Sequence, residues 1–148
     1  MNLRNLLGKK LKDDEVLEFI EDYDVGDVVY DFDRSHENME DIYWAASHSA
    51  GFQMRFNQDQ VLETIFCYIV KSGEFDPISQ NLIGVPVYKT FDEAEEASRK
   101  AGVVYSVSDA SKGREFYKMW LRMESPDAWV HYQFQDGKVG RVTLMLPW

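Results

Sequence analysis

The sequence predicts a single α+β domain: a mainly antiparallel sheet of about six to seven strands with two or three helices packed against it. A chain of 148 residues with 45% hydrophobic content is long enough to bury one core. Several segments alternate with a period of two and follow one another through short turns, which is typical of antiparallel pairing. Only two or three stretches have helical spacing. We expect one domain over 1–148, with an acidic segment at 1–41 and a sheet-rich body at 42–148.

The first elements are predicted to be helical. A short lead-in carries Leu3, Leu6 and Leu7 and ends at Gly8. A helix over 13–22 follows, because its apolar residues recur at three- and four-residue spacing and its first turn is acidic, which suits the helix dipole. The next segment, "VVYDFDR", alternates with a period of two and predicts a strand with one acidic, solvated face.

The body begins with two strands, 42–47 and 51–57, predicted to form a hairpin. The segment 60–70 has apolar residues at both parities, so we expect a central strand covered on each face. A long irregular stretch follows at 71–90, where glycines and prolines recur.

A second helix is predicted at about 91–101. Thr90 and Glu93 have the spacing of a capping box, and Gly102 stands where a helix commonly ends. Strands are expected at 103–109, 114–124, 128–135 and 138–148. The pair Asp136-Gly137 is the strongest hairpin signal in the chain.

The charge is distributed very unevenly. The net charge is −10, and residues 1–41 hold 13 acids against 5 bases. Ten carboxylates lie between Asp13 and Asp33 with no Lys or Arg among them. Such a field repels nucleic acid and anionic membranes, so it predicts a basic partner or a purely solubilising role.

Metal and cofactor chemistry is not predicted. The three histidines (His36, His48 and His131) have no second His or Cys at ligand spacing, and Cys67 is the only cysteine. Asp22, Asp24 and Asp27 resemble part of a calcium loop, but Gly26 comes one position early and the closing glutamate is missing.

Catalytic residues are not predicted either. The "SHS" at 47–49 places serines beside a histidine, but neighbours in sequence rarely share catalytic geometry, and no GxSxG or phosphate-loop pattern occurs. The basic residues are scattered along the chain. We therefore expect a protein that is not an enzyme.

Four segments carry a family resemblance. They are "GFQMRFNQDQVLETIFCYI" (51–69), "GVPV" (84–87), the capped acidic helix (90–101) and "DGKVGRVTLM" (136–145). Together they resemble a pattern of small bacterial immunity-type proteins from interbacterial toxin systems. The resemblance spans about residues 51–145 and implies a non-enzymatic protein that binds and neutralises a cognate toxin domain.

Resemblance and charge lead to one hypothesis: an immunity protein that occludes a basic toxin, with a nuclease as the first expectation, because nucleases need basic surfaces to hold phosphates. Aromatic side chains near the acids would supply binding energy. The candidate partner-binding residues are Glu18, Glu21, Asp22, Asp24, Asp27, Asp31, Asp33, Tyr30, Tyr43 and Trp44.

Three alternatives stay open. The acidic segment could be only a solvated face. The protein could be a small enzyme or ligand-binding domain with a cleft under the 71–90 loop, using His131 or Glu124. It could also be a chaperone or adaptor for a secreted effector. Apolar runs are short and the first residues lack the pattern of a secretory signal, so we expect a cytoplasmic protein.

Overall fold

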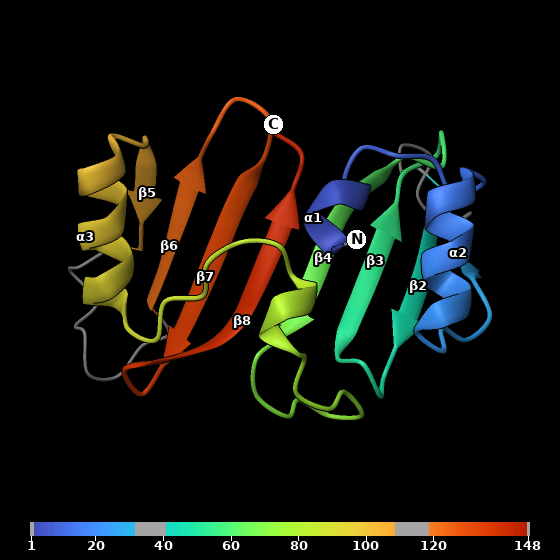
Figure 1. Cartoon of the computed structure of the whole chain (residues 1–148), viewed down its shortest axis with the longest axis horizontal. Coiled ribbons are helices and arrows are strands. Elements are labelled where there is room, and N and C mark those ends of the chain that lie inside the picture. The colour runs from blue at the N-terminus through green and yellow to red at the C-terminus, as the bar shows by residue number, and fades with distance from the viewer. Residues whose placement is uncertain (1, 32–40, 109–118, 148) are drawn as a thin grey trace.

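The structure, a computed structural model, describes residues 2–31, 41–108 and 119–147. It is a mixed α/β arrangement with one open antiparallel sheet in the strand order β1-β2-β3-β4-β8-β7-β6-β5 (Figure 1). The helices are α1 (Leu3–Leu6), α2 (Asp14–Asp22), α3 (Phe91–Ala101) and a 3-10 turn, η1 (Gln80–Leu82). The strands are β1 (Val29–Asp31), β2 (Ile42–Ser47), β3 (Phe52–Phe56), β4 (Leu62–Tyr68), β5 (Tyr105–Val107), β6 (Met119–Glu124), β7 (Trp129–Gln135) and β8 (Lys138–Met145).

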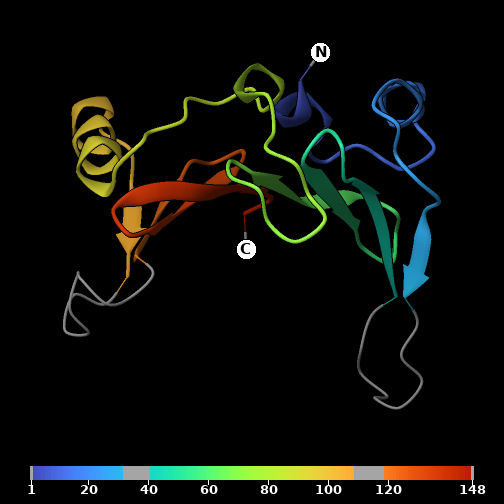
Figure 2. The same ribbon diagram turned by 90° about the horizontal axis from the view of Figure 1, so that it is seen from below.

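All the helices lie on one face of the curved sheet (Figure 2). The core lies between them and that face, because alternate strand residues point towards the helices. The register joins these residues into rows across the sheet, as in Ala45, Met54, Ile65 and Leu144. The other face carries no helix in the described ranges, and we call it the open face.

The stretch 71–90 crosses the helix-bearing face. Its apolar residues Ile78, Leu82 and Ile83 are buried in the core. The hydroxyl of Tyr132 donates a hydrogen bond of 2.7 Å to the carbonyl oxygen of Pro86, which fastens the stretch to β7. It is therefore irregular, as predicted, and is held down along much of its length.

The predicted α+β architecture is confirmed, but the predicted number of about six to seven strands is wrong: the sheet has eight strands within the described residues. Both outer strands, β1 and β5, fall within segments predicted to be strands, but each has only three residues in the described structure. The central position of β4 is confirmed by its pairing with β3 and β8. Within the described ranges, helices cover only one of its faces, whereas both were predicted to be covered.

Local signals are confirmed where they were strongest. Asp136 and Gly137 both have positive φ angles, 53° and 79°, as a tight hairpin turn between β7 and β8 requires. Thr90 Oγ1 accepts a hydrogen bond of 3.3 Å from the Glu93 backbone amide, and Gly102 ends α3 with φ 67°. The predictions for Asp33, His36 and the strand residues 114–118 lie outside the described residues.

Candidate binding surfaces

Helix α2 is fixed to the sheet by aromatic contacts. The Phe19 ring is 4.4 Å from the Tyr23 ring and 5.6 Å from the Phe52 ring of β3, measured between centroids. Behind the helix, Ser47 Oγ donates a hydrogen bond of 2.6 Å to the Tyr23 carbonyl oxygen. With its apolar side buried in this way, α2 presents Glu18, Glu21 and Asp22 to solvent.

Three carboxylates of α2, those of Glu18, Glu21 and Asp22, destabilise the helix. Glu18 and Asp22 are four residues apart on one side of the helix, where like charges repel. Glu21 and Asp22 occupy the last turn, where the helix dipole disfavours negative charge, and that turn holds no base. None of the three forms an ion pair with another described residue. Helix stability therefore does not account for these acids.

Asp24 and Asp27 border a hollow on the open face, which we call the acidic hollow. It has a volume of about 700 Å³ and is also lined by Trp44, His48 and Gln53. Asp24 adopts φ 53°, a conformation that Asp tolerates better than most residues. The chain after α2 thus bends around the sheet edge and brings two carboxylates beside an aromatic ring.

The predicted binding residues fall on two sides of the sheet edge. Glu18, Glu21 and Asp22 lie on the helix side, whereas Asp24 and Asp27 lie at the acidic hollow. Tyr30 and Tyr43 are direct cross-strand neighbours with ring centroids 4.9 Å apart, and Tyr43 packs against the core. Trp44 points to the opposite face. Asp31 ends β1, and Asp33 lies outside the described residues.

The open face carries a ladder of aromatic and arginine side chains. The Trp44 ring stacks with Phe66 at 6.3 Å, and the guanidinium of Arg141 lies 5.4 Å from the Phe66 ring centroid. Further along, Arg122 lies 4.4 Å from the Trp129 ring. Such contacts are favourable because a guanidinium is attracted to the face of an aromatic ring. The ladder joins the acidic hollow to the centre of the sheet.

His131 lies within this ladder and stacks on Trp120 with ring centroids 5.2 Å apart. Burial, with the positive charges of Arg141 and Arg122, lowers the pKa of His131 to about 4. The ring is therefore neutral at neutral pH. No carboxylate hydrogen bond to it occurs among the described residues.

A second hollow on the open face was not predicted. We call it the arginine hollow; it has a volume of about 200 Å³ and is lined by Arg141, Gln133, Gln135, Gly140, Tyr68 and Ser72, with Val70 and Lys71 at its edge. In the sequence, Arg141 is one of several scattered bases. The available signal was parity: Arg141, Gln133 and Tyr68 occupy the outward positions of three strands that the register places side by side.

The structure does not bring His131 and Glu124 under the 71–90 loop; only the start of that loop, Lys71 and Ser72, lines a hollow on the open face, the arginine hollow. The buried part of that loop lies on the helix-bearing face, whereas His131 and Glu124 belong to the open face, where Glu124 pairs with Arg122 at 2.9 Å. Within the described ranges, no group of three or more potential ligand side chains is close enough to hold a metal ion.

Among the described residues, no helix has the length and apolar character needed to cross a bilayer. Comparison of the chain with protein-family models, with curated proteins and with solved structures finds no match.

Proposed function

We propose that the protein is an immunity-type inhibitor that binds a basic toxin domain, with a nuclease as the first candidate, and blocks it by occupying its cationic surface. The supporting observation is a set of exposed carboxylates that form no ion pair among the described residues: Glu18, Glu21 and Asp22 on α2, and Asp24 and Asp27 at the acidic hollow. The three on α2 also destabilise their own helix. Surface charge kept at a cost to stability is typical of a surface selected for binding.

The two parts of this surface affect different steps of binding. The carboxylates on α2 attract a cationic partner over a distance and raise the association rate at low salt. Trp44 lines the acidic hollow with Asp24 and Asp27, so its ring adds apolar contact area for an incoming Lys or Arg side chain, beside the Arg55 guanidinium that lies 5.7 Å from the ring centroid. A partially buried tryptophan of this kind is typical of residues that slow dissociation.

Co-expression tests the activity. The neighbouring reading frame is expressed in a sensitive host, alone and together with this protein. We expect growth arrest in the first case and growth in the second. A harmless neighbour, or toxicity that persists when both proteins are made, contradicts the immunity proposal; binding without protection indicates an adaptor instead.

Association kinetics test the surface. Changing Glu18, Glu21 and Asp22 together to Lys should slow association with the toxin about tenfold at low salt and flatten its salt dependence. The matched control changes Asp59, Glu96 and Asp127 to Lys, which gives the same change in net charge at exposed positions elsewhere. Equal effects of the two triple variants would show that only net charge matters. Trp44→Ala should instead raise the dissociation rate, with a loss of about 2 kcal/mol in binding free energy.

A further inference from the structure

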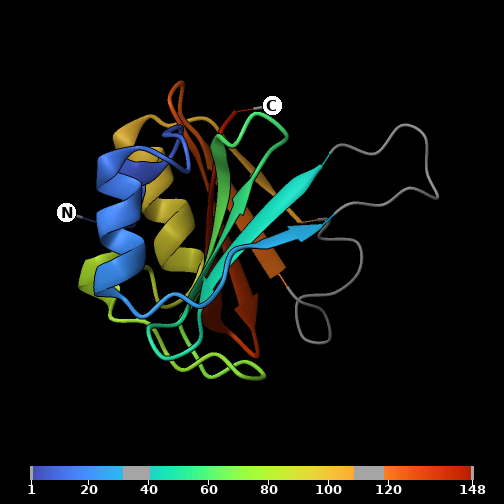
Figure 3. The ribbon, with the colours of Figure 1, turned by 90° about the vertical axis from the view of Figure 1, so that its right-hand side faces the viewer.

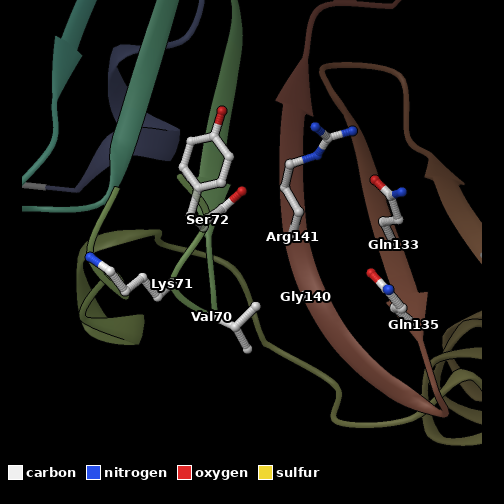
Figure 4. A pocket seen from close by; sticks show the side chains of 8 residues that line it. Val70, Lys71, Ser72, Gln133, Gln135, Gly140 and Arg141 are labelled. Atoms are coloured by element: carbon white, nitrogen blue, oxygen red, sulfur yellow. The ribbon is translucent and has the colours of Figure 1, made fainter. Parts of the chain in front are cut away.

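The arginine hollow lies between the end of β4, with the residues that follow it, and the paired strands β7 and β8 (Figure 4). Arg141 and Gln133 are direct cross-strand partners, and the Gln135 side chain extends from the same strand as Gln133. Tyr68 is the partner of Arg141 on the other side, in β4. The hollow therefore gathers a guanidinium, two carboxamides and a hydroxyl from three neighbouring strands.

The charge of Arg141 is not neutralised within the described structure. Two other arginines of the open face are paired: Arg55 lies 3.1 Å from Glu63, and Arg122 lies 2.9 Å from Glu124. Lys71 pairs with Asp76 at 3.1 Å, and its side chain runs away from Arg141 in Figure 4. Among the described residues Arg141 forms no ion pair, although the protein has a net charge of −10.

Arg141 also has an unsatisfied donor. Its Nε is buried and has no hydrogen-bond partner among the described residues. Arg55 Nε likewise lacks an aligned hydrogen bond, but it has the Glu63 carboxylate beside it. A buried donor without an acceptor is unfavourable, and the Nε–H of an arginine can form a bidentate pair with an anion together with an Nη–H of the same guanidinium.

A backbone irregularity creates the space. The pairing of β7 with β8 changes between Gln133↔Arg141 and Phe134↔Val139, which leaves Gly140 as an extra residue in β8. The φ angle of Gly140 is not positive, so the backbone does not require glycine there. A Cβ at this position would stand 3.8 Å from Val70 Cγ2, an ordinary contact. The missing side chain therefore leaves the hollow open.

Size and charge select the ligand. A volume of about 200 Å³ is below the range of roughly 300–1,000 Å³ common for drug-sized ligands, so a single small group fits. The single unpaired guanidinium can neutralise one negative charge, whereas the net charge of −10 repels a second one. A monoanion is therefore favoured over a dianion. We propose that the arginine hollow is a binding site for a single carboxylate group, held by the Arg141 guanidinium with the Gln133 and Gln135 carboxamides as further donors. This site goes beyond the proposed function, because it lies away from the acidic hollow and needs no toxin.

The test is a titration with sodium acetate at pH 7, followed by ¹H–¹⁵N NMR of the Arg141 Nε–Hε group and the Gln133 and Gln135 side-chain amides. Sodium chloride keeps the ionic strength constant. We expect saturable shifts in the millimolar range, with weaker binding of inorganic phosphate in a parallel titration. The absence of saturation, or tighter binding of phosphate than of acetate, would overturn the proposal.

Two variants and a control assign the effect. Arg141→Gln should weaken acetate binding at least about tenfold. Gly140→Ala should weaken it about threefold or more by filling the hollow, and it meets no clash in the structure. Arg55→Gln removes one guanidinium from the same face and should leave acetate binding unchanged. Equal losses of acetate binding in the two arginine variants would show a general charge effect and contradict the site. If Arg141→Gln does not fold, the acetate affinity of Gly140→Ala decides whether the site exists.

A peptide titration separates the two sources of such a carboxylate. The probe is Ac-Gly-Asp-Gly-NH₂, which carries one side-chain carboxylate. Peptide binding at least as tight as acetate binding supports the site and assigns it to a partner protein, whereas acetate binding with exclusion of the peptide supports it and assigns a small acid. Because no toxin is present, failure here leaves the proposed immunity function untouched, and failure of co-expression leaves this site untouched.

Discussion

Helices α2 and α3 cover the same face of the sheet near its opposite edges, and they carry their charges in opposite ways (Figures 1 and 3). In α3, Asp92 and Glu93 lie in the first turn and Arg99 and Lys100 in the last, as the helix dipole favours. Two ion pairs, Glu95–Arg99 and Glu96–Lys100, link successive turns. In α2 the acids continue to the last residue without a base.

The difference shows which charges stability explains. Every charged residue of α3 either suits the dipole or has a partner one turn away, so its composition needs no function outside the helix. In α2, Asp14 and Glu15 suit the dipole and Glu15 pairs with Lys9, but Glu18, Glu21 and Asp22 oppose both rules. They therefore call for another explanation, and binding of a cationic partner supplies one. Three predictions test whether the two helices differ in charge alone.

The largest effect should be the same in both helices. Phe19 in α2 and Phe91 in α3 are buried against aromatic rings of the sheet, Phe52 and Phe134. Phe19→Ala and Phe91→Ala should each lower the free energy of unfolding by about 3 kcal/mol, measured by urea denaturation, because each leaves a cavity. Leu17, 46% exposed in α2, is the control, and Leu17→Ala should cost less than about 1 kcal/mol. A small loss for Phe19→Ala would mean that α2 is not anchored as described.

A smaller effect should separate the helix starts. Thr90 caps α3 through its hydroxyl, so Thr90→Ala should cost about 1 kcal/mol in the same denaturation experiment. Asp13 precedes α2 but makes no side-chain cap; its carboxylate instead accepts a hydrogen bond of 2.9 Å from the Lys10 amide. Asp13→Ala should therefore cost about 0.3 kcal/mol, also because it removes one of several like charges. Equal costs would argue against the difference in capping.

The smallest effect should have opposite signs in the two helices. Asp22→Lys places a base in the last turn of α2, four residues after Glu18, and should stabilise the protein by about 0.5 kcal/mol. Lys100→Glu breaks the pair with Glu96 and should destabilise it by a similar amount. Thermal unfolding at low salt measures both, and high salt should reduce both changes. Destabilisation by Asp22→Lys would show that this acid has a structural role.

Much of the fold could be predicted because its signals are local. The hairpin at Asp136-Gly137 and the start of α3 at Thr90 depend on residues close together in sequence. The extent of an outer strand could not be predicted as well: β5 pairs with β6 only over Tyr105–Val107, where a strand over 103–109 was predicted. The one-sided arrangement of helices also depends on how the connections cross the sheet.

The candidate site divides in the same way. The acids of α2 are visible in the sequence because charge is a property of composition. Their division between the helix side and the acidic hollow is not, since it follows from the turn at Asp24. The arginine hollow combines Tyr68, Gln133 and Arg141, and only the register and the extra residue at Gly140 bring them together.

The position of Cys67 has a practical consequence. Its side chain is fully buried on the core side of β4, and burial raises the pKa of its thiol. The reactive thiolate is therefore scarce and shielded, so maleimide reagents should leave the native protein unmodified. A cysteine introduced at an exposed position beside either hollow could then carry a fluorophore or spin label at a single known point, without first removing the natural one.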